Sequence, residues 1–158
     1  MTYRRRALGV LVLLTLCSLP VFAATNVAVV AGKDSQAQGI QLSDLKQILK
    51  STDSTGTEKQ RVTLVMRDPS SQEMRLVVRQ VFGVAPEEAK AQIAALNEHR
   101  KDRPLVRIVD SDEAVLKIVS AVPNSLGFVN LYAIDSSVKV LRVDGKLPFD
   151  PGYALKGN

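Results

Sequence analysis

The 158-residue chain has few of the side chains that enzymes and metal sites use most: one cysteine, one histidine and no tryptophan. One cysteine cannot form an internal disulfide, and one histidine supports neither a clustered metal site nor a Ser-His-Asp triad. Aromatic residues make up only 4% of the chain, which disfavours the stacking platforms that bind sugars or single-stranded nucleic acids. We therefore expect a protein that is not an enzyme, with no catalytic residues, no metal, no cofactor and no nucleic-acid partner.

The amino terminus has the pattern of a secretory signal peptide. Three consecutive arginines precede an apolar run (7–19), and Ala23 and Ala24 supply the small residues that signal peptidase requires. The alternative, a retained membrane anchor, is disfavoured because a span needs about 20 apolar residues. We expect cleavage after Ala23, so that residues 1–23 are removed and residues 24–158 form one periplasmic domain.

Loss of this segment changes the meaning of the composition. The three arginines lower the net charge from +5 to +2 when they leave, so no strong argument for binding nucleic acid or a membrane surface remains. The single cysteine, Cys17, leaves as well. Leu16 stands where a lipoprotein signal has a small residue, so we do not expect lipidation.

Beyond the signal, short apolar runs alternate with segments of helical periodicity. We expect strands at 26–31, 61–66, 105–109, 126–133 and 138–143, and helices at 40–50, 71–82, 86–99 and 111–122. Ser43 is the expected N-cap of the first helix, and the polar stretch 51–60 is expected to be a surface loop. This alternation is typical of an α/β domain whose sheet is flanked by helices.

The segment Arg67 to Gln72 (RDPSSQ) follows a strand and precedes a helix. In open α/β sheets, ligands bind at the carboxyl ends of strands, where helix N-termini offer free N–H groups. Ser70 and Ser71 add hydroxyl donors, and Arg67 adds a charged fork that suits carboxylate, phosphate or sulfate. The junction predicts an oxyanion site. The alternative is an ordinary helix cap with a solvated arginine.

A second strand-to-helix junction is Asp110-Ser111-Asp112-Glu113. Ser111 is a further candidate for ligand binding, because its hydroxyl and the N–H groups after it would face the same cleft. Asp112 and Glu113 oppose a bound anion but suit the positive end of a helix dipole. A capped helix is therefore the favoured interpretation of this junction.

Four segments, in this order, resemble one known group of proteins: LSDLKQILKS, RVTLVMRDPSSQEMR, IVDSDEAVLKIVSAVPNSLGFV and VKVLRVDGKLPFDPGYAL. The group is the phosphate-binding-protein-like type 2 periplasmic solute-binding proteins, the extracytoplasmic receptors of ABC transporters. The resemblance covers most of the chain after the signal. It implies one lobe of such a receptor, with a mixed sheet flanked by helices.

The resemblance also implies roles for single residues. Arg67 matches the anion-binding arginine of the group, and Ser71 matches the serine whose hydroxyl and amide contact the anion. Ser70 stands where the group has glycine. Gln72 and Glu73 replace a Gly-Thr pair, so a hydroxyl donor is lost and a carboxylate is gained, which would repel a bound dianion unless the side chain turns away.

The function implied is recognition of phosphate or a similar small oxyanion, with an ABC transporter permease or another envelope protein as partner. A full member of the group has two lobes around its ligand, and this chain is about half that size. Such a lobe could bind alone or form a homodimer with a cleft. The alternative is a periplasmic interaction or sensory domain that keeps the fold but not the ligand site.

Overall fold

The computed structural model describes residues 26–50, 62–98, 100 and 103–157. The expected signal peptide, the expected loop at 51–60 and the end of the third expected helix at His99 lie outside the described residues. Within the described part, no helix is long and apolar enough to cross a membrane.

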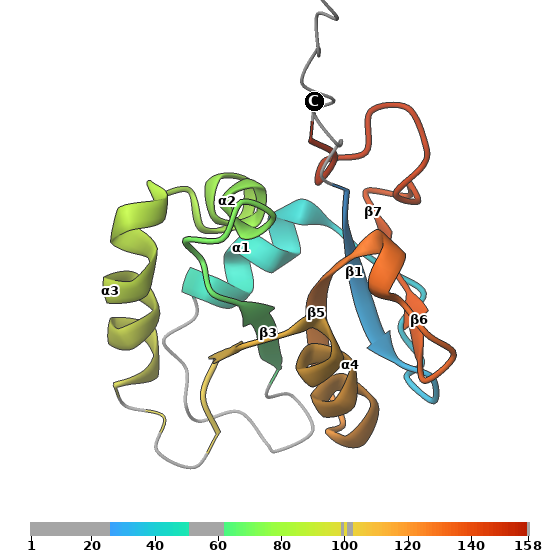
Figure 1. The fold of residues 1–158 in the computed structure, drawn as a ribbon, viewed down its shortest axis with the longest axis horizontal. Helices are drawn as coiled ribbons and strands as arrows, with labels where there is room; N and C mark the ends of the chain where they lie inside the picture. Colours follow the sequence, from blue (N-terminus) through green and yellow to red (C-terminus); the bar gives the residue numbers. More distant parts are fainter. Residues whose placement is uncertain (1–25, 51–61, 99, 101–102, 158) are drawn as a thin grey trace, which may run out of the picture.

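A mixed five-stranded sheet, in the order β4-β3-β5-β1-β6, forms the centre of the domain (Figure 1). Its strands are β1 (Val27–Gly32), β3 (Thr63–Arg67), β4 (Val106–Val109), β5 (Ser125–Asn130) and β6 (Val138–Val140). β3 runs parallel to β4 and β5, whereas β1 runs antiparallel to β5 and β6. A separate two-stranded parallel sheet joins β2 (Gly39–Ile40) to β7 (Arg142–Val143).

Helices cover both faces of the large sheet. The larger apolar core packs residues of α1 (Leu42–Lys50), α2 (Met74–Val77), η2 (Val78–Phe82) and α3 (Pro86–Asn97) against one face. The smaller core packs α4 (Asp112–Ala121) against the other face, and Figure 1 shows α4 lying over β5. β1 is apolar along most of its length because its side chains point alternately into the two cores. The predicted α/β domain with a mixed sheet flanked by helices is confirmed.

The strand register brings two junctions together. β3 and β4 are parallel neighbours, and Arg67 at the end of β3 lies opposite Val109 at the end of β4. The chain leaves β3 into the turn before α2 and leaves β4 into the start of α4. Both junctions that the sequence singled out therefore lie at the same edge of the sheet.

The helix expected at 71–82 begins later than expected. A turn spans residues 69–73, and α2 starts at Met74. The delay follows from Asp68: its carboxylate accepts the Ser70 amide at 2.8 Å and its carbonyl accepts the Ser71 amide at 2.9 Å. These bonds hold the chain in a turn, and the first helical bond that follows runs from the Arg75 amide to the Ser71 carbonyl at 3.1 Å.

The far end of this helical segment agrees better with the sequence. The spacing of Met74, Val77, Val78 and Val81 in the sequence predicts one apolar face for this helix. This face is confirmed, because all four residues are buried. The segment continues as the π-helical turn η2 and ends at Gly83, whose φ of 71° is the left-handed conformation that glycine adopts without strain.

Ser43 is not the N-cap of α1. That helix begins at Leu42, one residue earlier, and the Leu42 amide donates to the carboxylate of Asp144 at 2.9 Å. Asp144 lies in the turn after β7, where it and Gly145 both have positive φ. The first amide of α1 thus has its acceptor in a distant part of the sequence.

Two strands are shorter than expected. β5 ends at Asn130, whose side chain accepts the Tyr132 amide at 3.0 Å and starts the short 3-10 helix η3 (Leu131–Ala133). The run 138–143 is divided into β6 and β7, which belong to different sheets. Leu141 joins them and is buried, and its amide donates to the Val29 carbonyl at 2.8 Å.

Candidate functional site

Arg67 is the charged centre of the sheet edge where the two junctions meet. It is the last residue of β3, and its side chain is 26% exposed. Guanidinium Nη1 lies 3.4 Å from Asp112 Oδ2, at the start of α4, and 3.8 Å from Glu73 Oε2, just before α2. Arg67 is therefore not the solvated arginine of the alternative interpretation: it joins the two junctions through a pair of carboxylates.

The two carboxylates are held differently. Asp112 is 12% exposed, and its second oxygen accepts the Asn130 amide at 3.3 Å. Glu73 is 30% exposed, and its contact with Arg67 is its only polar contact within the described chain. Asp112 thus fixes the guanidinium against β5, whereas Glu73 lies in a looser position.

Two donor-bearing atoms of the β3–α2 junction are buried and unused. Arg67 Nε and Ser71 Oγ have no hydrogen-bond partner among the described residues. A buried donor without a partner costs about 1–3 kcal/mol, so native structures rarely keep one without a reason. Both of these unpaired donors belong to one short junction, the one that the sequence singled out.

Ser70 serves the turn rather than the open side of the junction. Its amide and its hydroxyl both interact with the Asp68 carboxylate, which also accepts Lys90 Nζ of α3 at 2.8 Å. These bonds, led by the one from Lys90, lower the pKa of Asp68 below its ordinary value, although the residue is exposed. The anchored Asp68 fixes the path of the chain between Arg67 and Ser71.

Ser111 is the N-cap that the sequence indicated. Its Oγ accepts the Ala114 amide at 3.1 Å, and Ala114 lies in the first turn of α4. Its hydroxyl also contributes to the low pKa of Glu113, after the backbone N–H of Glu113 itself and ahead of the charge of Arg67. The favoured interpretation of a capped helix is confirmed, and the hydroxyl of Ser111 is engaged within its own junction.

The sequence indicated Glu73 and missed Asp112. Glu73 was expected to repel a bound dianion unless its side chain turned away, and its carboxylate faces Arg67. Asp112 was interpreted as an acid that suits the helix dipole and opposes a bound anion. Its pairing with Arg67 was missed, because nothing in its own segment shows that β3 lies beside β4. The strand order would have supplied the missing signal, because parallel neighbours bring Arg67 and residue 112 to one edge.

A hollow of about 580 Å³ lies away from these residues. It is lined by the end of β1, the loop 34–37, the last turn of α4 and the turn before β5. None of the predicted site residues lines it. Within the described residues, no group of three or more His, Cys, Asp or Glu side chains is placed to hold a metal ion.

No protein-family model matches the chain. Individual proteins that are similar to it in sequence or in fold are phosphate receptors by name. The phosphate-binding protein PstS 2 of Streptococcus agalactiae serotype V is 30% identical over 96 residues, which are 61% of this chain and 31% of that protein. The chain thus matches about a third of the length of this relative.

Solved structures show a likeness of fold. An ABC-type phosphate transport receptor from Vibrio cholerae has a TM-score of 0.60 and 18% identity, covering 85% of this chain and 54% of the receptor. PstS from Borrelia burgdorferi has a TM-score of 0.58 and 19% identity, covering 85% and 55%. The predicted resemblance to phosphate-binding proteins is confirmed, in sequence over part of the chain and in fold over most of it.

Proposed function

We propose that this protein is an extracytoplasmic solute-binding protein that recognises phosphate or a similar small oxyanion and works with an ABC transporter. In this proposal residues 1–23 direct export and are removed, and the remaining chain acts in the periplasm. It binds its ligand and catalyses no reaction. The similarity to proteins named as phosphate receptors supports this function over the alternative of an interaction or sensory domain.

The observation that carries the proposal is that two hydrogen-bond donors of the β3–α2 junction, one of them in the guanidinium of Arg67, have no partner in the described chain. Arg67 Nε and Ser71 Oγ are buried and unpaired within the described chain. Asp112, which the Asn130 amide holds in place, contacts the guanidinium at Nη1 and orients it. An oxyanion would accept from both groups in charge-assisted bonds, which are about twice as strong as neutral ones. Ser70 stabilises the turn through its bonds to Asp68, and Ser111 caps α4 at the neighbouring junction.

The surrounding acids set a condition on the ligand. Asp112 and Glu73 both lie within 4 Å of Nη1, and Glu113 follows Asp112 in the first turn of α4. A fully ionised dianion is repelled by these carboxylates. An oxyanion that keeps a proton can donate its O–H to one of them, so we expect phosphate to bind better than sulfate.

Calorimetric titration of residues 24–158 with phosphate, sulfate and molybdate tests the function. We expect saturable binding of phosphate, and the variant Arg67→Ala should weaken it by roughly tenfold or more, since a hydrogen bond to a charged group is worth about 1.5–3 kcal/mol. Arg75→Ala is the matched control, because Arg75 is an exposed arginine on α2 and its loss changes the net charge equally.

The outcomes separate the two functions that the sequence left open. Binding that is lost in Arg67→Ala and kept in Arg75→Ala supports the oxyanion site. No heat at millimolar phosphate would leave the interaction or sensory domain as the better explanation. Equal weakening in both variants would show a response to net charge rather than to a site.

A further inference from the structure

The contact between Glu73 and Arg67 has a consequence for ligand affinity. Both carboxylates approach the same nitrogen of Arg67, Asp112 at 3.4 Å and Glu73 at 3.8 Å. Only Asp112 has a second anchor, the Asn130 amide at 3.3 Å. Glu73 has none within the described chain, is more exposed, and precedes a helix that has no side-chain cap.

These differences make Glu73 the weaker partner. Ion pairs between exposed side chains contribute little net stability, because solvent screens the charges and both side chains lose conformational freedom. The pair of Arg67 with Asp112 is closer and less exposed, and a backbone hydrogen bond fixes the acid. An oxyanion that approaches Arg67 therefore displaces Glu73 more readily than Asp112.

We propose that Glu73 is an internal competitor for Arg67 that sets the anion affinity of the site, and that Asp112 is a positioning residue that holds the guanidinium in place. This inference rests on the proposed oxyanion function. With no ligand bound, the Glu73 carboxylate lies at Nη1 of Arg67, whereas Nε of the same guanidinium has no partner in the described chain. The competition is therefore for the charge of Arg67 and not for one nitrogen atom. When an anion binds, Glu73 swings away into solvent, which its exposure allows, while Asp112 stays.

The two acids therefore have opposite effects when their charge is removed. Glu73→Gln keeps the shape of the side chain but no longer competes for the guanidinium, so phosphate affinity should rise roughly two- to tenfold. Asp112→Asn keeps an oxygen that can accept the Asn130 amide but loses the charge that orients Arg67. We expect phosphate affinity to fall in this variant, although removal of a negative charge alone would raise it.

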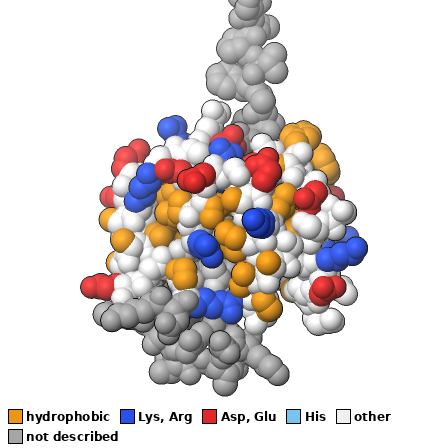
Figure 2. Space-filling view, turned by 60° about the horizontal axis from the view of Figure 1, so that its bottom comes forward, with side chains coloured by type: hydrophobic (Ala, Val, Ile, Leu, Met, Phe, Trp, Pro, Cys, Tyr) orange, Lys and Arg blue, Asp and Glu red, His pale blue; other side chains and the backbone are white. Residues whose placement is uncertain are grey.

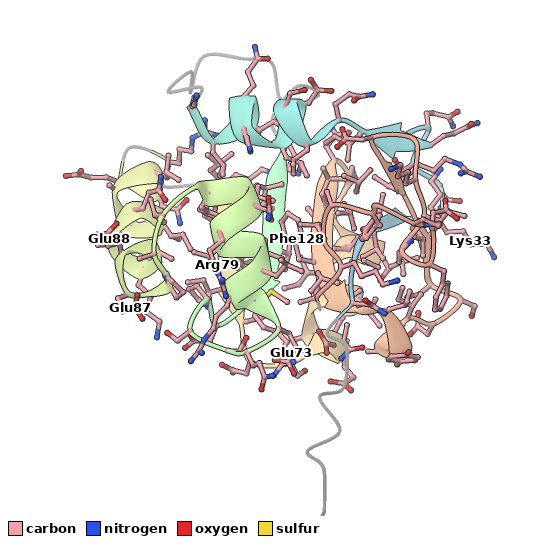
Figure 3. All side chains as sticks on the ribbon, turned by 90° about the horizontal axis from the view of Figure 1, so that it is seen from above. Lys33, Glu73, Arg79, Glu87, Glu88 and Phe128 are labelled. Carbon is pink, nitrogen blue, oxygen red and sulfur yellow. The ribbon has the colours of Figure 1, made fainter. Side chains whose placement is uncertain are left out.

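Glu87→Gln is the control for net charge. Figure 3 shows Glu73 at the start of the α2 segment and Glu87 on the separate helix α3. Glu87 is exposed in the first turn of α3, so its loss changes the net charge of the protein without touching Arg67. Its phosphate affinity should match that of the unaltered protein.

The test is calorimetric titration of the three variants and the unaltered protein with inorganic phosphate at one ionic strength. Tighter binding in Glu73→Gln, weaker binding in Asp112→Asn and no change in Glu87→Gln support the inference. Saturable binding in Glu73→Gln alone also supports it, and would show that the unaltered protein is not a working receptor. Unchanged affinity in Glu73→Gln, or an equal gain in Glu87→Gln, overturns the competitor while leaving the oxyanion function standing. If none of the four proteins binds phosphate, both the competitor role of Glu73 and the oxyanion function are overturned.

Discussion

The two strand-to-helix junctions at one edge of the sheet contain similar residues but differ in their hydrogen bonds. After β4, Ser111 is extended and its hydroxyl accepts the Ala114 amide, so the first turn of α4 has a cap. After β3, the helix begins without a side-chain cap and is four residues long before it widens into η2. Ser71 lies in this second junction with a buried hydroxyl that has no partner in the described chain.

Under the proposed function, the difference separates a junction that stabilises the fold from one that binds a ligand. A cap satisfies amide groups that would otherwise lack acceptors, and the helix gains stability from it. The junction after β3 has no such cap: Asp68 holds its turn, and Arg67 Nε and Ser71 Oγ have no partner in the described chain. Beyond the turn that Asp68 holds, the start of the helix is positioned by apolar packing, because Met74, the first residue of α2, is fully buried in the larger core.

The largest expected effect tests whether packing holds the uncapped junction. Met74→Ala should lower the free energy of unfolding by about 2–5 kcal/mol, because it removes a buried side chain and leaves a cavity. Urea denaturation measures the change. Leu76→Ala in the same helix is the control, since Leu76 is only half-buried and should cost clearly less. An equal loss in both variants would show that Met74 is not the anchor.

An intermediate effect tests the capped junction. Ser111→Ala removes the acceptor of the Ala114 amide and should lower the free energy of unfolding by about 1 kcal/mol. Ser120→Ala, near the other end of α4, removes an exposed hydroxyl that donates to the Lys117 carbonyl. Surface changes of that kind stay within about 0.5 kcal/mol. A thermal unfolding series would contradict the capping role if the two variants behaved alike.

Local patterns predicted the parts of this edge that depend on neighbours in the sequence. The spacing of Met74, Val77 and Val81 gives the buried face of the helix before the structure is known. The cap at Ser111 and the helix end at Gly83 follow from side-chain chemistry within a few residues. Arg67 and Ser71 were predicted as candidate site residues because they lie in a strand-to-helix turn.

The remaining features depend on contacts between distant segments. Asp112 pairs with Arg67 only because β4 lies beside β3 in parallel. Asp144, and not Ser43, accepts the first amide of α1, because β7 pairs with β2 and the turn after β7 therefore lies beside that helix. No periodicity within either segment contains this information, so the pairing of Asp112 with Arg67 became visible only with the fold.

The smallest expected effect on stability gives the sharpest contrast between the junctions. Ser71→Ala removes a buried hydroxyl that has no partner in the described chain, so the free energy of unfolding should stay the same or rise by up to about 1 kcal/mol. Phosphate affinity should nevertheless fall by roughly tenfold or more, because the bond lost is one to a charged ligand. Ser43→Ala, an exposed serine in the first turn of α1, should change neither quantity. Denaturation and calorimetry on the same preparations decide the matter. A loss of stability as large as that of Ser111→Ala would mean that both serines serve the fold, and the distinction between a capped junction and one kept for a ligand would fail.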